Sequence, residues 1–255
     1  MTTSQDLAGR VAVITGASSG IGQASALLLA SRGARVALLA RRQAALESLA
    51  AEIRAAGGQA LALPADATDA ASVQAAAQAV RREFGCADLV FNNAGLMLPG
   101  AVGEQPFEEW QRQIDINVTG AMRVIHAFVP QLEQAAARGG PSDLVNTSSI
   151  AGQYVYGNFA VYSATKAYVS HLTRHLRLEL GPRDIRVGMI EPGITATELQ
   201  DHFTFQGAKD WLAGAAQSIE FLRAEDVAQV LGFIVSQPRH VNLQQVVVMP
   251  TREGI

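Results

Sequence analysis

The sequence has little cysteine and no surplus of positive charge. Cys86 is the single cysteine among 255 residues, so no internal disulfide can form, and we expect this thiol to be a small, partly buried residue. Lysines and arginines number 20 and acidic residues 23, for a formal net charge of −3, which argues against a nucleic-acid partner. A signal peptide and an apolar run long enough to span a bilayer are also missing. We therefore expect a cytoplasmic protein with no membrane partner.

Short β-branched runs alternate with alanine-rich helical stretches along the chain. Such alternation is typical of βαβ units that form a parallel sheet. No linker, repeat or low-complexity segment divides the sequence, so we expect one α/β domain over residues 1–255, a Rossmann-type doubly wound parallel sheet with helices on both faces. The predicted strands span residues 10–15, 35–40, 59–63, 88–91, 142–147, 185–190 and 245–249. The predicted helices span residues 21–32, 43–56, 70–84, 107–137, 162–180 and 224–236.

Residues 193–220 form the least regular part of the sequence. Phe203, Phe205 and Trp211 stand there among polar residues, a composition suited to a mobile lid over a pocket. A surface excursion with ordinary packing gives a similar pattern, and the sequence alone leaves both interpretations open.

A glycine-rich turn joins the first predicted strand to the first predicted helix. Gly16, Gly20 and Gly22 fall where the chain has to turn sharply and approach a ligand closely. The free N–H groups and the dipole of the following helix favour an anion, and a dinucleotide pyrophosphate is the usual occupant of such a turn. The turn therefore predicts a dinucleotide site.

Tyr162 and Lys166 lie four residues apart in a strongly helical stretch, so their side chains leave the same face of the helix. A free phenol has a pKa of about 10, and a neighbouring ammonium favours its ionised form. The pair therefore suits acid–base chemistry, although a Tyr-x-x-x-Lys spacing by itself is typical of an ordinary helix surface.

The glycine turn, Thr-Gly-x-x-x-Gly-x-Gly at residues 15–22, resembles that of the short-chain dehydrogenase/reductase family, and further motifs of that family follow in order. They are Asn92-Asn-Ala-Gly95, Asn117, Ser149, Tyr162-Ser-Ala-Thr-Lys166 and Pro192-Gly193. The resemblance covers nearly the whole chain. It implies the strand order 3-2-1-4-5-6-7 and a homotetramer, or a homodimer, paired through the predicted helices 107–137 and 162–180.

The same resemblance implies an oxidoreductase and gives four residues a catalytic role. Tyr162 exchanges a proton with the substrate oxygen while hydride passes between a nicotinamide and the substrate carbon. Ser149, rather than its neighbour Ser148, hydrogen-bonds that oxygen. Lys166 holds the nicotinamide ribose and, together with the positive charge of the oxidised nicotinamide, lowers the pKa of Tyr162. Asn117 holds a water between the lysine and solvent, although its side chain also suits a plain backbone contact.

The end of the second predicted strand indicates which nicotinamide cofactor to expect. Ala40 stands where NAD-preferring relatives carry aspartate, and Arg41 and Arg42 follow with guanidinium groups suited to a 2′-phosphate. We therefore expect NADP(H), although two arginines also suit the solvated start of a helix. Asp66 matches the adenine-contact position of the family and equally suits an N-cap. The residues implied to bind the cofactor are Gly16, Ser18, Ser19, Gly20, Ile21, Gly22, Arg41, Arg42, Asp66, Ala67, Asn93, Ala94, Gly95, Tyr162, Lys166, Pro192, Gly193, Thr195 and Thr197.

The substrate is predicted to be an apolar ketone, aldehyde or secondary alcohol. The sequence resembles the branch of the family that holds bacterial carbonyl, 3-hydroxy-acid and clavulanate-type aldehyde reductases, so a 3-hydroxy-acid dehydrogenase is one alternative. A catalytically idle NADPH sensor is another, while a sugar-nucleotide epimerase is disfavoured because little chain follows the last predicted strand. The residues predicted to line the substrate pocket are Met97, Tyr154, Tyr156, Phe159, Phe203, Phe205 and Trp211.

Two further features remain outside this scheme. His171 and His175 lie four apart on one predicted helix, but the glutamate of a zinc-binding H-E-x-x-H motif and a third ligand are missing, so we expect no metal. Glu191 stands where many members of the family have a less charged residue, and the sequence assigns it no role.

Overall fold

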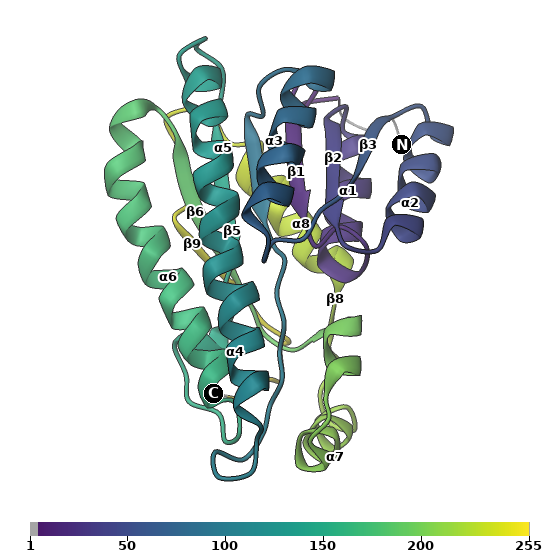
Figure 1. Cartoon of the computed structure of the whole chain (residues 1–255), viewed down its shortest axis with the longest axis vertical. Helices are drawn as coiled ribbons and strands as arrows, with labels where there is room; N and C mark the ends of the chain where they lie inside the picture. Colours follow the sequence, from purple (N-terminus) through teal and green to yellow (C-terminus); the bar gives the residue numbers. More distant parts are fainter. Residues whose placement is uncertain (1–4, 255) are drawn as a thin grey trace.

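Seven parallel strands form one sheet at the centre of the molecule, in the order β3-β2-β1-β4-β5-β6-β9 (Figure 1). The computed structural model describes residues 5–254. Its strand order confirms the predicted doubly wound α/β fold. The strands are β1 (Val11–Thr15), β2 (Arg35–Ala40), β3 (Gln59–Pro64), β4 (Leu89–Asn92), β5 (Asp143–Thr147), β6 (Arg186–Pro192) and β9 (Gln245–Val248).

Helices cover both faces of the sheet. Figure 1 shows α3, α5 and α6 in front of the strands and α8 behind them. Each face has its own buried core, one built with α1, α2 and α8 and the other with α3, α5 and α6. Since both faces are covered, strands such as β1 are buried at every residue and read as continuous apolar runs. The helices are α1 (Gly20–Ser31), α2 (Gln43–Ala55), α3 (Ala70–Phe84), α4 (Phe107–Ile114), α5 (Ala121–Ala136), α6 (Ala160–Leu180), α7 (Gln206–Ala215) and α8 (Ala224–Val235).

The predicted helix 107–137 is not continuous. A π-helical segment, Asp115–Gly120, separates α4 from α5. Its wider turn carries Asn117, whose buried side chain is bonded to residues outside the helix, and π-helical turns often occur at functional sites. Residue-type patterns do not distinguish such a turn from regular α-helix, so the prediction missed it.

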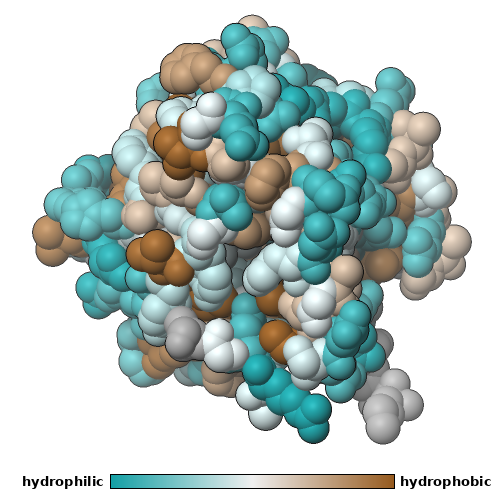
Figure 2. Space-filling view, turned by 90° about the horizontal axis from the view of Figure 1, so that it is seen from below, coloured by the Kyte–Doolittle hydropathy of each residue, from teal (hydrophilic) through white to brown (hydrophobic). Residues whose placement is uncertain are grey.

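Residues 193–220 contain more regular structure than we expected. They hold β7 (Thr195–Ala196), which pairs with β8 (Leu222–Arg223), then a 3-10 helix (Glu198–His202), and finally α7. Phe203 and Ala208 are buried against Phe159 of the chain entering α6, and this packing fixes the segment. Figure 1 shows α7 at the bottom, and Figure 2 shows this end of the molecule, where separate apolar side chains stand among polar ones.

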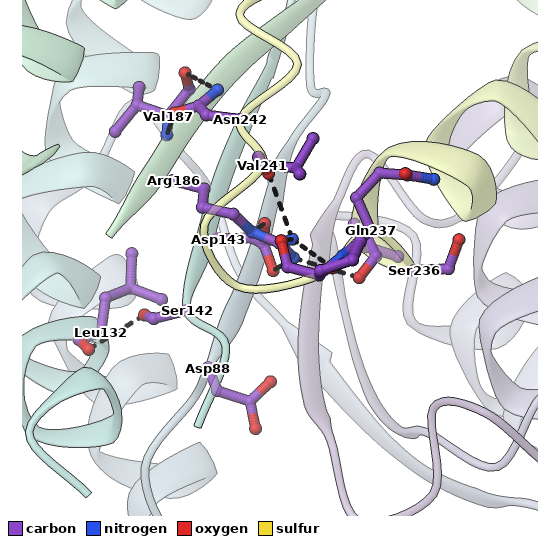
Figure 3. A network of polar contacts seen from close by, with 12 residues as sticks. Asp88, Leu132, Ser142, Asp143, Arg186, Val187, Ser236, Gln237, Val241 and Asn242 are labelled. Atoms are coloured by element: carbon purple, nitrogen blue, oxygen red, sulfur yellow. Dashed lines mark hydrogen bonds and ion pairs between the residues drawn. The ribbon is translucent and has the colours of Figure 1, made fainter. Parts of the chain in front are cut away.

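A buried ion-pair network ties the amino ends of four strands together. The Asp143 carboxylate accepts hydrogen bonds from Arg186 Nε at 2.8 Å and from Arg10 Nη2 at 2.7 Å. Arg10 also pairs with Asp88, and Arg186 reaches the carbonyl oxygen of Val235 at the end of α8. Figure 3 shows Arg186 between Asp143 and the loop that follows α8. The network fixes the strands relative to one another at the edge of the sheet opposite to α7.

Within residues 5–254, no helix has the length and apolar character needed to cross a membrane.

Candidate active site

A pocket of about 390 Å³ opens at the carboxyl ends of the strands. This is the edge at which ligands bind in doubly wound sheets. Most of the residues that the sequence singled out meet on its wall, although they come from eight separate parts of the chain. They are Gly16, Ser18, Ser19, Gly20, Ile21, Arg41, Arg42, Asp66, Ala67, Asn93, Ala94, Gly95, Met97, Ser149, Tyr156, Phe159, Tyr162, Lys166, Pro192, Gly193, Thr195, Thr197, Phe203 and Trp211.

The glycine turn lies against the segment that follows β4. Gly16 and Gly20 have φ values of +66° and +53°, a backbone region that favours glycine. Gly22 does not line the pocket, because it packs inward, where an added Cβ would lie 2.3 Å from the carbonyl oxygen of Gly16. The Thr15 hydroxyl accepts hydrogen bonds of 2.9 Å from the backbone N–H groups of Asn93 and Ala94. These hydrogen bonds fix the glycine turn against the segment after β4, and the glycines Gly16 and Gly20 line the pocket without side chains.

The far end of the pocket carries the two arginines that follow β2. The Arg42 Nε donates to the Ser18 hydroxyl at 3.1 Å, and its Nη2 pairs with the Glu198 carboxylate at 2.8 Å. The sequence did not single out Glu198, and its position directly after Thr197 is the only signal it gives. Arg41 lines the same wall without an ion pair among the described residues.

Asp66 lines the pocket but is not the N-cap of α3. Its carboxylate accepts hydrogen bonds from the backbone N–H and the hydroxyl of Thr68 at 2.8 and 2.7 Å. Although partial burial opposes the effect, these bonds hold the pKa of Asp66 below its ordinary value. The N-cap is Asp69, which accepts from the N–H of Ala71. The capping alternative for Asp66 is therefore wrong.

Tyr162 and Lys166 lie side by side at the buried end of the pocket, where 7% and 5% of their surfaces are exposed. The Lys166 ammonium is 5.7 Å from the centroid of the Tyr162 ring and donates to the Thr147 carbonyl oxygen at 2.9 Å. Burial raises the pKa of Tyr162 to about 12, while a hydrogen bond with Ser149 acts in the opposite direction. Burial lowers the pKa of Lys166 to about 8.

The expected lowering of the Tyr162 pKa is thus not found in the protein by itself. Desolvation penalises the phenolate more than the protein groups around it stabilise it. At neutral pH the phenol therefore keeps its proton and is placed as a donor.

Ser149 and Ser148 face different partners. Ser149 caps the 3-10 turn Ile150–Gly152, since its oxygen accepts from the N–H of Ala151 at 3.1 Å. Its hydroxyl proton is directed to the Tyr162 oxygen, since the hydrogen bond between the two side chains favours the ionised phenol. The Ser148 hydroxyl contacts the Lys166 carbonyl oxygen at 2.9 Å and the Ser170 hydroxyl at 2.7 Å, so it is engaged within the fold.

Asn117 does not line the pocket. Its side-chain oxygen accepts a hydrogen bond from the backbone N–H of Leu96 at 2.7 Å. Its amide nitrogen donates to the carbonyl oxygen of Leu96 at 2.8 Å and to the Thr165 hydroxyl at 3.0 Å. It therefore joins the segment after β4 to α6, beside Lys166. The predicted role of Asn117 in holding a water stays a prediction.

The predicted substrate wall is only partly correct. Met97, Tyr156, Phe159, Phe203 and Trp211 line the pocket, and the Phe159 and Trp211 rings pack edge to face with centroids 5.5 Å apart. Within residues 5–254, the buried Tyr156 hydroxyl has no hydrogen-bond partner.

Two predicted wall residues lie elsewhere. Tyr154 is 38% exposed outside the pocket, and Phe205 folds back over Gly207 at the start of α7. Residues that the prediction missed also line the pocket: Gln200, His202, Leu212 and Glu253. Glu253 accepts from the N–H of Ile194 at 3.0 Å, a contact between segments that no local pattern signals.

Glu191 is fully buried directly behind the pocket. Its carboxylate accepts hydrogen bonds from the Ser170 hydroxyl at 2.8 Å, from the Gln245 amide at 2.7 Å and from the Gln153 amide. It thus joins α6, β9 and the turn that carries Ser149. Its place behind the pocket indicates a structural carboxylate.

His171 and His175 are exposed on α6 with their Nε2 atoms 3.2 Å apart. Among residues 5–254, no three or more histidine, cysteine, aspartate or glutamate side chains gather in a metal-binding arrangement.

Comparisons with known proteins place this geometry in a family. Residues 10–206 match the family model described as short chain dehydrogenase. The chain is 37% identical, over 98% of its own length, to the glycine betaine reductase ATRR of Emericella nidulans, of which it covers 19%. It thus spans about a fifth of that relative's length.

Solved structures give the same picture over the whole chain. A 3-ketoacyl-(acyl-carrier-protein) reductase from Brucella melitensis, complexed with NADH, is 33% identical with a TM-score of 0.84 and coverage of 96% of this chain and 99% of its own. The closed form of a serine dehydrogenase complexed with NADP+ is 28% identical with a TM-score of 0.88 and coverage of 96% of each chain.

Proposed function

Since the chain belongs to the short-chain dehydrogenase family of oxidoreductases, we propose that it is an NADP(H)-dependent carbonyl reductase or alcohol dehydrogenase. Its substrate is an apolar ketone or aldehyde, or the corresponding secondary alcohol. The observation that carries the proposal is the meeting of Tyr162, Lys166 and Ser149 in one pocket that also contains the glycine turn.

The described residues fit a dinucleotide cofactor. The pocket runs from Arg41 and Arg42 at one end to Tyr162 at the other, and its floor is the glycine turn and the start of α1. The first N–H groups of α1 are free to bind the pyrophosphate. When bound, the nicotinamide supplies a hydride to the substrate carbon or takes one from it.

Tyr162 is the general acid in reduction and the general base in oxidation. Because burial holds its pKa at about 12, the phenol arrives protonated and donates to the carbonyl oxygen as negative charge develops there. Lys166, with a pKa of about 8, is a cation at neutral pH and stabilises the phenolate that is left. The Ser149 hydroxyl, which hydrogen-bonds Tyr162 in the structure, donates to the same oxygen when the substrate is bound.

Arg41 and Arg42 support NADP(H) over NAD(H), because β2 ends at Ala40 and provides no carboxylate for a ribose 2′-hydroxyl. Relatives of known structure carry NADP+ or NADH. Phe159, Phe203 and Trp211 support an apolar substrate.

Phe107 and Tyr168 are exposed on α4 and α6. They support the proposed pairing of chains through these helices into a homotetramer or homodimer. A cytoplasmic location remains a prediction.

The test is Tyr162→Phe, assayed with NADPH and NADH over a panel of aryl and alkyl ketones and aldehydes. We expect the turnover number to fall about 10²- to 10⁴-fold, with NADPH still bound. Tyr168→Phe is the matched control, because Tyr168 lies exposed on the same helix and contacts Met122. Its activity should equal that of the unmodified protein.

An unchanged rate in Tyr162→Phe contradicts the mechanism. Tight NADPH binding by the unmodified protein without turnover of any panel member favours the sensor instead. Turnover of 3-hydroxy acids alone favours the hydroxy-acid dehydrogenase.

A further inference from the structure

One guanidinium group at the cofactor end of the pocket already has an anionic partner. Arg42 pairs with Glu198 at 2.8 Å and donates to the Ser18 hydroxyl at 3.1 Å. Arg42 comes from the start of α2, whereas Glu198 belongs to the segment that follows β6. The pair therefore links the proposed 2′-phosphate site to residues 193–220.

Local contacts hold Glu198 in this place. Thr197 and Gln200 form a capping box that fixes the 3-10 helix beginning at Glu198. The Thr197 side chain lies against the glycine turn, 3.1 Å from where a Cβ on Gly20 would be. The hydrogen bond from Arg42 and a weaker contribution from Ser19 lower the pKa of Glu198, so its carboxylate is ionised at neutral pH.

An ionised carboxylate at this point repels a phosphate group and competes with it for Arg42. A phosphate monoester carries about −1.5 to −2 charges near neutral pH. A phosphate binds a guanidinium group best through two parallel N–H bonds, and the Nη2 atom of Arg42 already bonds to Glu198. A cofactor with a free ribose hydroxyl makes no such demand and is not repelled.

We propose that Glu198 is a specificity-determining residue that competes with the cofactor 2′-phosphate for Arg42, so that the chain prefers NADP over NAD less strongly than its two arginines alone would give. The inference rests on the proposed function, because it concerns the same cofactor site. Phosphate binding then releases Glu198 from Arg42.

Isothermal titration calorimetry with adenosine 2′,5′-bisphosphate and adenosine 5′-monophosphate tests the competition without any catalytic step. An exposed ion pair corresponds to about a two- to fivefold change in an equilibrium constant. We therefore expect Glu198→Gln to bind the bisphosphate about two- to fivefold more tightly and the monophosphate as the unmodified protein does. Glu198→Ala should change in the same direction.

Two further variants separate competition from overall charge. Glu83→Gln removes the same charge from an exposed pair with Arg82, away from the pocket, and should leave both affinities unchanged. In an Arg42→Ala background, Glu198→Gln should bring a smaller gain, because the contested guanidinium is gone.

Three outcomes would overturn the inference: no gain in Glu198→Gln, an equal gain for both nucleotides, or a gain that persists undiminished in the Arg42→Ala background. Titrations with NADP+ and NAD+ distinguish this failure from that of the proposed function. A protein that binds neither dinucleotide refutes the function, whereas one that binds them with Glu198→Gln unchanged refutes only the role of Glu198.

Discussion

The two edges of the sheet both bury charged side chains, but they treat them differently. At the amino edge, the carboxylates of Asp88 and Asp143 pair with Arg10 and Arg186. At the carboxyl edge, Lys166 is as deeply buried as these arginines, yet within residues 5–254 no carboxylate pairs with it, and its ammonium donates to the carbonyl oxygen of Thr147. An opposite charge keeps a buried group ionised, whereas a carbonyl dipole alone stabilises the ionised form less, so the group loses its proton more easily.

The pKa directions of the two buried cations follow this difference, although burial raises the pKa of Asp88 in spite of its pair with Arg10. Although burial opposes it, the carboxylates of Asp143 and Asp88 hold the pKa of Arg10 above its ordinary value. Lys166 has no such partner, so burial lowers its pKa to about 8. The ion pairs at the amino edge therefore stabilise the fold. At the carboxyl edge, the burial of the unpaired Lys166 ammonium costs free energy, and a bound ligand can reduce this cost.

Breaking the paired edge should have the largest effect on stability. Asp143→Asn leaves Arg10 and Arg186 buried without their shared carboxylate, so we expect the free energy of unfolding to fall by about 3–5 kcal/mol. Urea denaturation followed by circular dichroism measures the change. Activity per folded molecule should stay the same.

Glu133→Gln is the control for that change, because it removes one carboxylate from an exposed ion pair with Arg183. It should lower the free energy of unfolding by less than about 1 kcal/mol. If the two variants lose the same amount, the amino-edge network is not the fixed structure described above.

Removing the unpaired charge should act in the opposite direction. Lys166→Met deletes a buried ammonium and keeps a similar volume, so we expect unfolding to require about 2 kcal/mol more at pH 7, after subtraction of the lost bond to Thr147. Turnover should fall at least about a hundredfold. Lys209→Met, at the chain's other lysine, is exposed on α7 and should change stability by less than about 0.5 kcal/mol. A destabilised Lys166→Met protein would show that the ammonium is a structural group.

The smallest effect is a change with pH. The pKa of Lys166 is about 8 in the folded protein and 10.5 for an ordinary lysine, so between these values the unfolded chain binds more protons and the stability of the unmodified protein rises with pH. The stability gain from Lys166→Met should therefore be about 1 kcal/mol smaller at pH 9 than at pH 7. A gain that is constant over this range would mean that Lys166 titrates as in the unfolded chain.

Much of the pocket wall could be predicted because its signals are local, whereas the strand order followed from the resemblance to the short-chain dehydrogenase/reductase family. The glycine turn, the β-branched runs and the i, i+4 spacing of Tyr162 and Lys166 each lie within a few residues of sequence. The structure places Tyr162, Lys166 and Ser149 together, while their chemical roles remain proposals. Tyr154 and Phe205 were misplaced because residue type does not reveal which way a loop side chain turns.

Other features could not be predicted because they arise between distant segments. The pair of Arg42 with Glu198, the contact of Glu253 with Ile194 and the use of the Asn117 side chain by Leu96 and Thr165 all join separate parts of the chain. The raised pKa of Tyr162 belongs to the same class, because desolvation depends on everything that surrounds the ring.

The sequence by itself determined the alternation of strands and helices and the glycine turn that follows β1, since each depends on residues close together along the chain. Only the tertiary structure decided which buried charges have partners and where solvent is excluded. Coulombic attraction and desolvation act through space, and the fold alone sets the distances over which they act.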